Sequence, residues 1–377
     1  MKILHLVESL ERGGLERVVI TLVLAQRAAG HDVAVCCLFH PGQLASELSE
    51  VGVRVTSANK TRGFDCRSIR HIRRELTQSG AAILHTHNAV ANYYGALAVS
   101  GTHVRLFNTR HGMGFAQRPG RKERLYRVSL LRTTAVAMVC EAARLHYVAN
   151  DIVPARLARV VRNGIDTSRF AGDSAARRTS MRRTLDLPAD AFVVGTVGRL
   201  NWAKNHALLV DSFALLAARL PASRLLVVGD GELRASLMQQ IERLNLSNRV
   251  LLAGDRDDVP ELLAAMDVFA MTSTTEGYSV ALLEAAAASL PTIASDVGGN
   301  SEIVQAGVTG QILAAPTATS LADALAQLAD DAVVRLEMGT RARAWAEQQA
   351  SIASMTQAYE LLYSNAIEQS TLTRVAL

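Results

Sequence analysis

The chain has 377 residues, of which 49% are hydrophobic and 20% are charged. A chain of this length exceeds one ordinary α/β core, so we expect two domains of about 170 residues each. The composition argues against a disordered protein, and no run approaches the roughly 18 apolar residues of a membrane-spanning helix. The cysteines form no CxxC pair, which predicts buried, reduced thiols of a cytosolic protein at Cys36, Cys37, Cys66 and Cys140.

Charge is distributed unevenly along the chain, although the formal net charge is only +5. Residues 1–170 contain 24 lysines and arginines against 12 acidic residues, a balance of +12. Residues 171–377 contain the other 16 against 23, a balance of −7. A cationic half joined to an anionic half indicates that the first half meets an anionic partner, such as a membrane surface or a phosphorylated substrate.

Strands and helices alternate from the N-terminus onward. In the first half we expect a helix over about 15–29, after Gly13-Gly14, and strands over 2–7, 31–39, 82–85, 104–109 and 135–140. The pattern restarts after residue 190, with helices expected over 207–220 and 232–244 and strands over 192–197, 224–228, 249–252, 268–271 and 291–294. This alternation predicts an α/β protein with two doubly wound parallel sheets. The polar stretch 166–189 has no apolar periodicity and is expected to be the linker.

The stretch Glu276-Gly-Tyr-Ser-Val-Ala-Leu-Leu-Glu284 is expected to begin as a loop and end as a helix. Ser279 is a favourable N-cap, and strong helix formers follow it. The first N–H groups of a helix can bind an anion, so two carboxylates flank a phosphate-binding helix end. This arrangement suits a ligand that has a diphosphate between two sugars, as a nucleotide-sugar has.

Together with the following Leu290-Pro-Thr-Ile-Ala-Ser-Asp-Val-Gly-Gly-Asn-Ser-Glu-Ile-Val304, this stretch resembles the Glu-x7-Glu region of retaining glycosyltransferases of family 4. The likeness runs from the first strand to about residue 350 and is most specific over 193–310. It implies the GT-B fold, in which two Rossmann-like domains face each other across a cleft. The acceptor-binding domain is expected over 1–168 with a returning helix at about 355–377, and the nucleotide-sugar-binding domain over 190–354. Without the flanking sequence, the two glutamates would be read as ordinary surface residues.

A second phosphate-binding element is expected in Gly198-Arg-Leu-Asn-Trp-Ala-Lys204, because it follows a strand at the edge where open α/β sheets bind ligands. Arg199 can bind phosphate oxygens with two donors, and Lys204 adds a point charge. The family carries an arginine and a lysine at this spacing on the donor diphosphate. Because fixed positive charge stabilises the departing nucleoside diphosphate, we expect no metal and no cofactor. Two surface cations on a loop are the alternative reading.

The resemblance also implies roles for single residues of the second half. Glu284 is expected to bind the ribose hydroxyls and Glu276 the transferred sugar, while backbone N–H groups of Tyr278, Ser279 and Val280 complete the cradle. Neither glutamate is expected to be a nucleophile, because front-face attack lets the departing phosphate help to deprotonate the acceptor. Two further residues that follow strands are expected in the nucleotide pocket, namely Gly229 and Arg256.

In the first half, Gly13 and Gly14 can let the backbone approach the donor diphosphate. A plain tight turn is the alternative, and the sequence there does not match GxGxxG. By resemblance His111 reaches the transferred sugar, the alternative being a structural histidine. The alternation of His85 and His87 places both on one face of a strand. No third ligand for zinc is evident in the sequence, so they are expected to line the cleft.

Basic residues interleaved with apolar ones indicate a surface that binds anionic membranes. This membrane patch comprises Arg118, Arg121, Lys122, Arg124 and Arg127. A solvated face is the alternative, and we expect no nucleic acid because no nucleic-acid-binding motif accompanies the patch.

The sequence thus predicts a retaining, metal-independent glycosyltransferase that is cytoplasmic and peripherally bound to the inner membrane. A UDP-sugar is the favoured donor, with GDP-mannose and ADP-heptose next, and the acceptor is a lipid-linked or lipopolysaccharide or exopolysaccharide glycan. The alternatives are a nucleotide-sugar epimerase on the same fold and a non-catalytic sugar-nucleotide-binding protein. An NAD-dependent oxidoreductase is least favoured, because no complete glycine fingerprint follows a strand.

Overall fold

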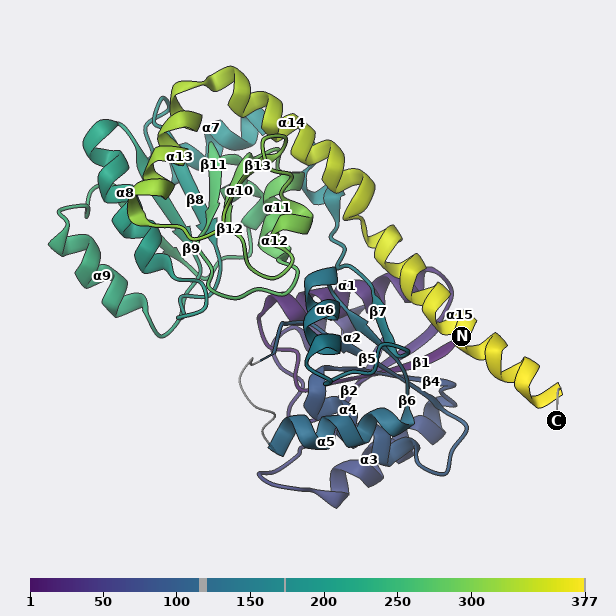
Figure 1. Cartoon of the computed structure of the whole chain (residues 1–377). Coiled ribbons are helices and arrows are strands. Elements are labelled where there is room, and N and C mark those ends of the chain that lie inside the picture. The colour runs from purple at the N-terminus through teal and green to yellow at the C-terminus, as the bar shows by residue number, and fades with distance from the viewer. Residues whose placement is uncertain (115–120, 173, 376–377) are drawn as a thin grey trace. The chain divides into compact units, whose positions relative to one another are not determined.

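The computed structural model describes residues 1–114, 121–172 and 174–375. The chain forms two compact units (Figure 1). The N-terminal unit comprises Met1–Gly164 together with the C-terminal helix from Ile352 onward, and the C-terminal unit comprises Ile165–Ser351. Among the described residues, no helix combines the length and the hydropathy that crossing a membrane requires.

The N-terminal unit is built on a seven-stranded parallel sheet in the order β3-β2-β1-β4-β5-β6-β7. Its strands are β1 (Lys2–Val7), β2 (Asp32–Cys37), β3 (Arg54–Ser57), β4 (Ile83–His87), β5 (Arg105–Arg110), β6 (Thr133–Met138) and β7 (Ala158–Val160). Its α-helices are α1 (Gly14–Ala28), α2 (Ala45–Glu50), α3 (Cys66–Ser79), α4 (Asn88–Val99), α5 (Arg121–Ser129), α6 (Glu141–Ala149) and α15 (Ile352–Val375).

Alternation along the strands divides the core of this sheet between its two faces. Leu4 and Leu6 of β1 belong to the cluster that includes Ile72 of α3 and Tyr94 of α4. On β2, Ala34 and Cys36 belong to the same cluster. The residues that alternate with them, such as Val35, belong to a second cluster with three residues of α1, namely Val19, Ile20 and Val23. Helix α15 contacts α1 and buries its Tyr359 and Tyr363 completely or nearly so.

The C-terminal unit is built on a six-stranded parallel sheet in the order β10-β9-β8-β11-β12-β13. Its strands are β8 (Val193–Val197), β9 (Arg224–Val228), β10 (Val250–Gly254), β11 (Val268–Met271), β12 (Thr292–Ser295) and β13 (Gly310–Leu313). Its α-helices are α7 (Ser174–Thr184), α8 (His206–Arg219), α9 (Arg234–Arg243), α10 (Val259–Ala264), α11 (Val280–Ala287), α12 (Asn300–Ile303), α13 (Ala318–Asp330) and α14 (Ala332–Gln349). The doubly wound parallel architecture predicted from the sequence is confirmed in both units.

Each sheet has one point where the strand order reverses. In the N-terminal unit the reversal lies between β1 and β4, and in the C-terminal unit it lies between β8 and β11. Open α/β sheets bind their ligands beyond the carboxyl ends of the strands at such a point. The stretch with Lys204 follows β8 and the stretch with Glu276 follows β11, so the two lie on either side of the reversal.

The stretch expected to be a linker forms helix α7 and belongs to the C-terminal unit, which therefore begins at residue 165 and not at 190. Arg178 and Arg182 of α7 each donate to a carboxylate oxygen of Asp267, both at 2.7 Å. Arg182 also donates to backbone carbonyl groups, including that of Ala191 at 2.9 Å. Because arginine–carboxylate bonds hold this helix to its unit, its sequence lacks the apolar stripe that would have predicted it.

The cysteines differ from the expectation at one position. Cys36, Cys37 and Cys140 are buried as expected, whereas Cys66 is exposed. Cys66 is the first residue of α3, directly after the N-cap Asp65 whose side chain accepts a hydrogen bond from the N–H of Arg67. Cys66 and the following Arg67 are both exposed, so the thiol at the start of the helix is not covered by the core.

Candidate active site

The loop after β8 is held along the end of β9 by backbone bonds. The N–H of Gly198 donates to the carbonyl of Val228, and that of Leu200 to the carbonyl of Asp230, both at 2.9 Å. Gly229 has a φ of +132°, and a Cβ added there would lie 2.1 Å from the carbonyl oxygen of Gly198. Only glycine fits this close approach. Gly229, which was expected in the nucleotide pocket, therefore lets the loop after β8 pack closely against the end of β9.

The loops after β8 and β11 are joined to each other. The hydroxyl of Thr272 donates to the carbonyl groups of Lys204 and Asn205, at 3.1 and 2.9 Å. The N–H of Thr274 donates to the carbonyl of Ala203 at 2.8 Å. These bonds fix the backbone on both sides of the strand-order reversal, so side chains from the two loops can meet with little loss of entropy on ligand binding.

Two of the predicted site residues, Lys204 and Glu276, meet at this place. Nζ of Lys204 donates to Oε1 of Glu276 at 2.5 Å. The hydroxyl of Ser273 donates to the same oxygen at 2.6 Å, and the Ser295 hydroxyl donates to the carbonyl of Ser273 at 2.6 Å. The exposed fraction of the Glu276 side chain is only 9%, so the charge is nearly enclosed with its partners. These bonds provide partners for a nearly enclosed carboxylate oxygen, which would be costly to bury without them.

The turn after β12 packs against the backbone of Glu276. Gly298 has a φ of +56°, and a Cβ added there would lie 2.0 Å from the carbonyl oxygen of Glu276. The N–H of Gly299 donates to the carbonyl of Gly277 at 2.8 Å, and the buried Asn300 amide donates to the carbonyl of Ser295 at 3.0 Å. The Val-Gly-Gly-Asn segment thus shapes the loop that carries Glu276, a role that its glycines could have signalled.

Helix α11 begins as the sequence predicted. Ser279 is its N-cap, and its hydroxyl accepts a hydrogen bond from the N–H of Leu282 at 3.4 Å. Tyr278 and Ser279 are buried, and Val280 is the first helical residue. Glu284 lies one turn further along and is half-buried. The helix start and the second glutamate therefore belong to one rigid element.

The other two cations of the expected donor site behave differently from Lys204. Arg199 lies on the loop after β8 and is exposed. Arg256 binds Asp258, its Nε donating to the carboxylate at 2.7 Å, and this bond raises the pKa of the Arg256 guanidinium. Asp255 and Asp257, on either side of Arg256, have Asp-x-Asp spacing, and both are exposed. The expectation of no metal rests on the positive charges of Arg199 and Lys204 and on the start of α11, and it stays a prediction.

In the N-terminal unit, Gly13 is the N-cap of α1 and Gly14 its first residue. His111 follows β5, and its Nε2 lies 2.9 Å from Nδ1 of His87. Burial lowers the pKa of His111 to about 3, so its imidazole is neutral at pH 7. Among the described residues, its Nδ1 has no hydrogen-bond partner although it is buried.

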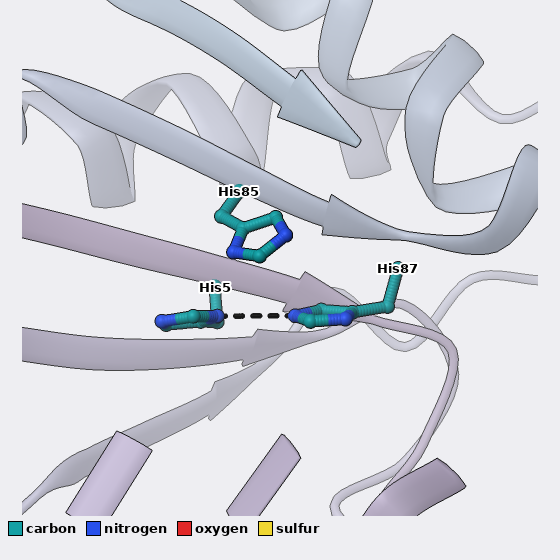
Figure 2. A group of neighbouring side chains, drawn as sticks. All are labelled: His5, His85 and His87. Carbon is teal, nitrogen blue, oxygen red and sulfur yellow. Dashed lines mark hydrogen bonds between the residues drawn. The ribbon is translucent and has the colours of Figure 1, made fainter. Parts of the chain in front are cut away.

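His85 and His87 share one face of β4 as predicted, with ring centroids 4.4 Å apart. The expectation that they line a cleft is wrong, because both are buried in the sheet and His5 of the neighbouring strand β1 lies beside them (Figure 2). The sequence separation hides this third histidine, although His5 and His85 are register partners in the parallel pair.

The three histidines His5, His85 and His87 lie close enough to hold a metal ion, with one ligand atom of each within 4.8 Å of the others. Every ring nitrogen already has a protein partner, however. His5 bonds His87 and Gln26, at 3.0 and 2.8 Å. His85 bonds Thr109 and Tyr363, at 2.7 and 2.6 Å, and His87 bonds His5 and His111. We therefore interpret the group as a hydrogen-bonded cluster.

The membrane patch is described only in part. Arg118 lies outside the described residues, as do the side chains of Arg121 and Lys122, whose backbone begins α5. Arg124 and Arg127 are exposed. Exposed apolar side chains accompany them, with exposed fractions of 45% for Leu125, 65% for Val128 and 80% for Leu131. Tyr126 faces the core and donates from its hydroxyl to Asn108 at 2.8 Å.

Two family models match consecutive parts of the chain. The model described as "Glycosyltransferase Family 4" matches residues 12–169, and "Glycosyl transferases group 1" matches residues 177–345. The chain is 29% identical to UDP-Gal:alpha-D-GlcNAc-diphosphoundecaprenol alpha-1,3-galactosyltransferase of Escherichia coli, over 72% of each chain. It is 31% identical to the lipopolysaccharide core biosynthesis glycosyltransferase LpsE of Rhizobium meliloti, over 62% of this chain and 65% of that one.

Solved structures agree with these matches. HepE of Anabaena, in complex with UDP-glucose, is 26% identical with a TM-score of 0.86, and the match covers 97% of this chain and all of that one (100%). WaaG, a glycosyltransferase involved in lipopolysaccharide biosynthesis, shares the fold with a TM-score of 0.73 at 18% identity, over 95% of this chain and 99% of that one. The chain belongs to the family 4 glycosyltransferases, has the GT-B fold and is a glycosyltransferase.

Proposed function

We propose that this glycosyltransferase moves a sugar from a UDP-sugar to a lipid-linked or lipopolysaccharide or exopolysaccharide acceptor at the cytoplasmic face of the membrane. We further propose that it retains the anomeric configuration and needs no metal ion. The observation that carries the proposal is the meeting of Lys204 with Glu276 at the strand-order reversal of the C-terminal unit. Ligands of open α/β sheets bind at that place.

The donor part of the proposal is supported by the charges at this sheet edge. Arg199 and Lys204 follow β8, and the N-terminus of α11 follows β11. An arginine, a lysine and a helix N-terminus can each stabilise the negative charge that grows on a departing diphosphate. Glu284 accepts hydrogen bonds from the ribose hydroxyls. HepE, which matches 97% of this chain, was solved with UDP-glucose, and this favours uracil as the base.

Glu276 is assigned to the hydroxyl groups of the transferred sugar and not to nucleophilic attack. Its Oε1 is already engaged by Lys204 and Ser273, and the loop is held by the turn at Gly298. A carboxylate fixed in this way is a rigid acceptor for hydroxyl groups. The acceptor oxygen then attacks from the face that the diphosphate leaves, and a phosphate oxygen takes the proton of the acceptor hydroxyl.

The acceptor part rests on what relatives are named for and on the surface of α5. The E. coli relative is named for a galactosyl transfer to a diphosphoundecaprenol-linked sugar, and LpsE for lipopolysaccharide core biosynthesis. Arginines alternate with exposed leucine and valine on α5 and the turn after it. Such a surface complements the anionic headgroups of a membrane while its apolar side chains enter the interface. We therefore assign this surface to an anionic membrane.

The experiment that tests the donor assignment is a calorimetric titration of the protein with UDP, GDP and ADP in buffer that contains EDTA. UDP is expected to bind at one site per chain and more tightly than GDP and ADP. Binding of none of the three would contradict the proposed site. A preference for GDP or ADP would show that the donor carries guanine or adenine and not uracil. The nucleotide that binds then selects the sugars for an activity screen.

A further inference from the structure

We propose that Gln26 is a positioning residue for sugar transfer: through His5 and His87, its amide fixes the tautomer of His111. In the selected tautomer, Nδ1 of His111 carries a lone pair that accepts a hydrogen bond from a hydroxyl of the transferred sugar. The inference rests on the proposed function for its ligand, while the relay itself is a property of the ligand-free N-terminal unit. It concerns residues of α1, β1 and β4 and the residue that follows β5.

The four side chains form one continuous line of hydrogen bonds. Oε1 of Gln26 lies 2.8 Å from Nε2 of His5. Nδ1 of His5 lies 3.0 Å from Nε2 of His87, the bond that Figure 2 marks with a dashed line. Nδ1 of His87 in turn lies 2.9 Å from Nε2 of His111. The line ends at Nδ1 of His111, a buried atom with no partner among the described residues.

Proton counting along the line determines every tautomer. A neutral imidazole has one donor and one acceptor nitrogen. A ring that donates at one nitrogen must therefore accept a hydrogen bond at the other. The Gln26 amide oxygen can only accept, so His5 carries its proton on Nε2 and accepts at Nδ1. His87 and then His111 must follow with protons on Nε2. Nδ1 of His111 is therefore an acceptor.

A second branch supports the same orientation of the Gln26 amide. Its Nε2 lies 3.5 Å from the hydroxyl of Tyr363, which lies 2.6 Å from Nδ1 of His85. If the amide nitrogen donates to Tyr363, that hydroxyl donates to His85. The reversed amide would leave a proton on Nδ1 of His111 with nothing to accept it, and unpaired buried N–H groups are rarer than unpaired acceptors. Gln26 is itself completely buried, which holds the amide between the two branches.

The relay needs neutral rings, and burial provides this condition. Burial lowers the pKa of His5 to about 4 and that of His111 to about 3, and it holds the pKa of His87 well below its usual value. An imidazolium has two donors and no acceptor, so it would interrupt the line. At neutral pH each ring on the line is therefore neutral, and the Gln26 amide determines which of its nitrogens carries the proton.

Two variants cut the line at different places, and a third serves as a matched control. Gln26→Met removes the acceptor while keeping the side-chain length, and His5→Phe keeps a ring but removes both nitrogens. The control Tyr359→Phe removes a buried hydroxyl that belongs to the other branch, where it lies 2.9 Å from Oγ1 of Thr109. Melting temperatures of all three variants show which of them are folded before the comparison is made.

The decisive readout is the tautomer of His111, measured by long-range proton–nitrogen NMR on ligand-free protein labelled with ¹⁵N-histidine. The wild type and Tyr359→Phe are expected to show a single Nε2–H form, whereas Gln26→Met and His5→Phe show a mixture. Because one hydrogen bond to the sugar is weakened, kcat/KM for release of UDP from the UDP-sugar should fall about tenfold in both cut variants. The Kd for UDP alone should stay within about twofold, and the double variant should be no worse than either single one.

An unchanged Nε2–H form in both cut variants would overturn the relay, as would an equal loss of activity in Tyr359→Phe. A stoichiometric metal found in the purified protein by elemental analysis would also overturn it, because a metal would replace the bond between His5 and His87. Failure of the proposed function looks different. In that case the wild type releases no UDP from any UDP-sugar, while the NMR measurement still decides whether Gln26 fixes the tautomer.

Discussion

Nζ of Lys204 and Oε1 of Glu276 lie 2.5 Å apart although 72 residues separate them in the chain. Lys204 comes from the loop after β8 and Glu276 from the loop after β11, the two strands between which the strand order reverses. The pair keeps a lysine and a carboxylate in place at one sheet edge without a ligand. In the proposed donor complex the diphosphate takes over part of the interaction with Lys204, which leaves Glu276 to the sugar.

The loss of Lys204 and the loss of Glu276 should have different effects on UDP binding. Lys204→Ala removes a charge-assisted bond to phosphate and should weaken the Kd for UDP by roughly 10- to 100-fold, since such bonds contribute about 1.5–3 kcal/mol. Glu276→Gln removes the competitor for Lys204, so UDP should bind as well as in the wild type or better. Both variants should lose at least about 100-fold in kcat, because each lacks a group that stabilises the transition state. Calorimetry and assays of UDP release check this, and equal losses of UDP affinity in both variants would contradict the assignment.

Glu284→Ala should weaken UDP binding by about tenfold or more, because a buried ribose loses a charged acceptor. The control Glu242→Ala removes an exposed glutamate of α9 and should bind UDP like the wild type. Titration with 2′-deoxy-UDP sharpens the test, since the missing hydroxyl should weaken binding to the wild type but not to Glu284→Ala. If Glu284→Ala binds UDP with unchanged affinity, Glu284 does not hold the ribose.

Replacing Arg124 and Arg127 by serine should weaken binding to vesicles that contain phosphatidylglycerol. Each cation near an anionic surface contributes about 1 kcal/mol, so the double variant should lose roughly 30-fold in partition. The matched control replaces Arg67 and Arg70 of α3, which are exposed and carry the same charge, by serine. Sedimentation with vesicles measures the difference. Equal losses in both double variants would indicate a general charge effect, and no loss would support a solvated face.

The free energy of unfolding should decrease as the pH falls from about 6.5 towards 4. Burial lowers the pKa of His5 and that of His206 to about 4. Between the unfolded and folded pKa values the unfolded chain binds more protons than the folded one, so acid favours unfolding. Each pKa unit corresponds to about 1.4 kcal/mol. Urea unfolding at several pH values measures the slope, which His206→Gln should reduce. A stability that stays constant or rises over this interval would contradict the buried neutral histidines.

The sequence was sufficient for the features that depend on local pattern. Short apolar runs located β1 and β8, and the run of helix formers after Ser279 located the start of α11 together with its N-cap. Such features depend on residue types within a few positions of one another. The doubly wound architecture followed from the alternation of elements, and the structure confirms it.

Features that depend on long-range pairing were not predictable in this way. Helix α7 lacks an apolar stripe because Arg178 and Arg182 bind Asp267, more than 80 positions away in the chain. The third histidine became visible only when the register placed His5 of β1 opposite His85 of β4. The bond between Lys204 and Glu276 likewise forms because β8 and β11 are neighbours in the sheet although β9 and β10 lie between them in the chain.

The most direct test of the proposed reaction is a proton NMR time course of a UDP-α-hexose with the enzyme in the presence of EDTA. Water then serves as the acceptor, and the anomeric signals show which form of the sugar is released before mutarotation mixes the two. Retention without a metal predicts that the α-anomer appears first while UDP accumulates. Release of the β-anomer first, or no release until Mg²⁺ or Mn²⁺ is added in excess of EDTA, would contradict it.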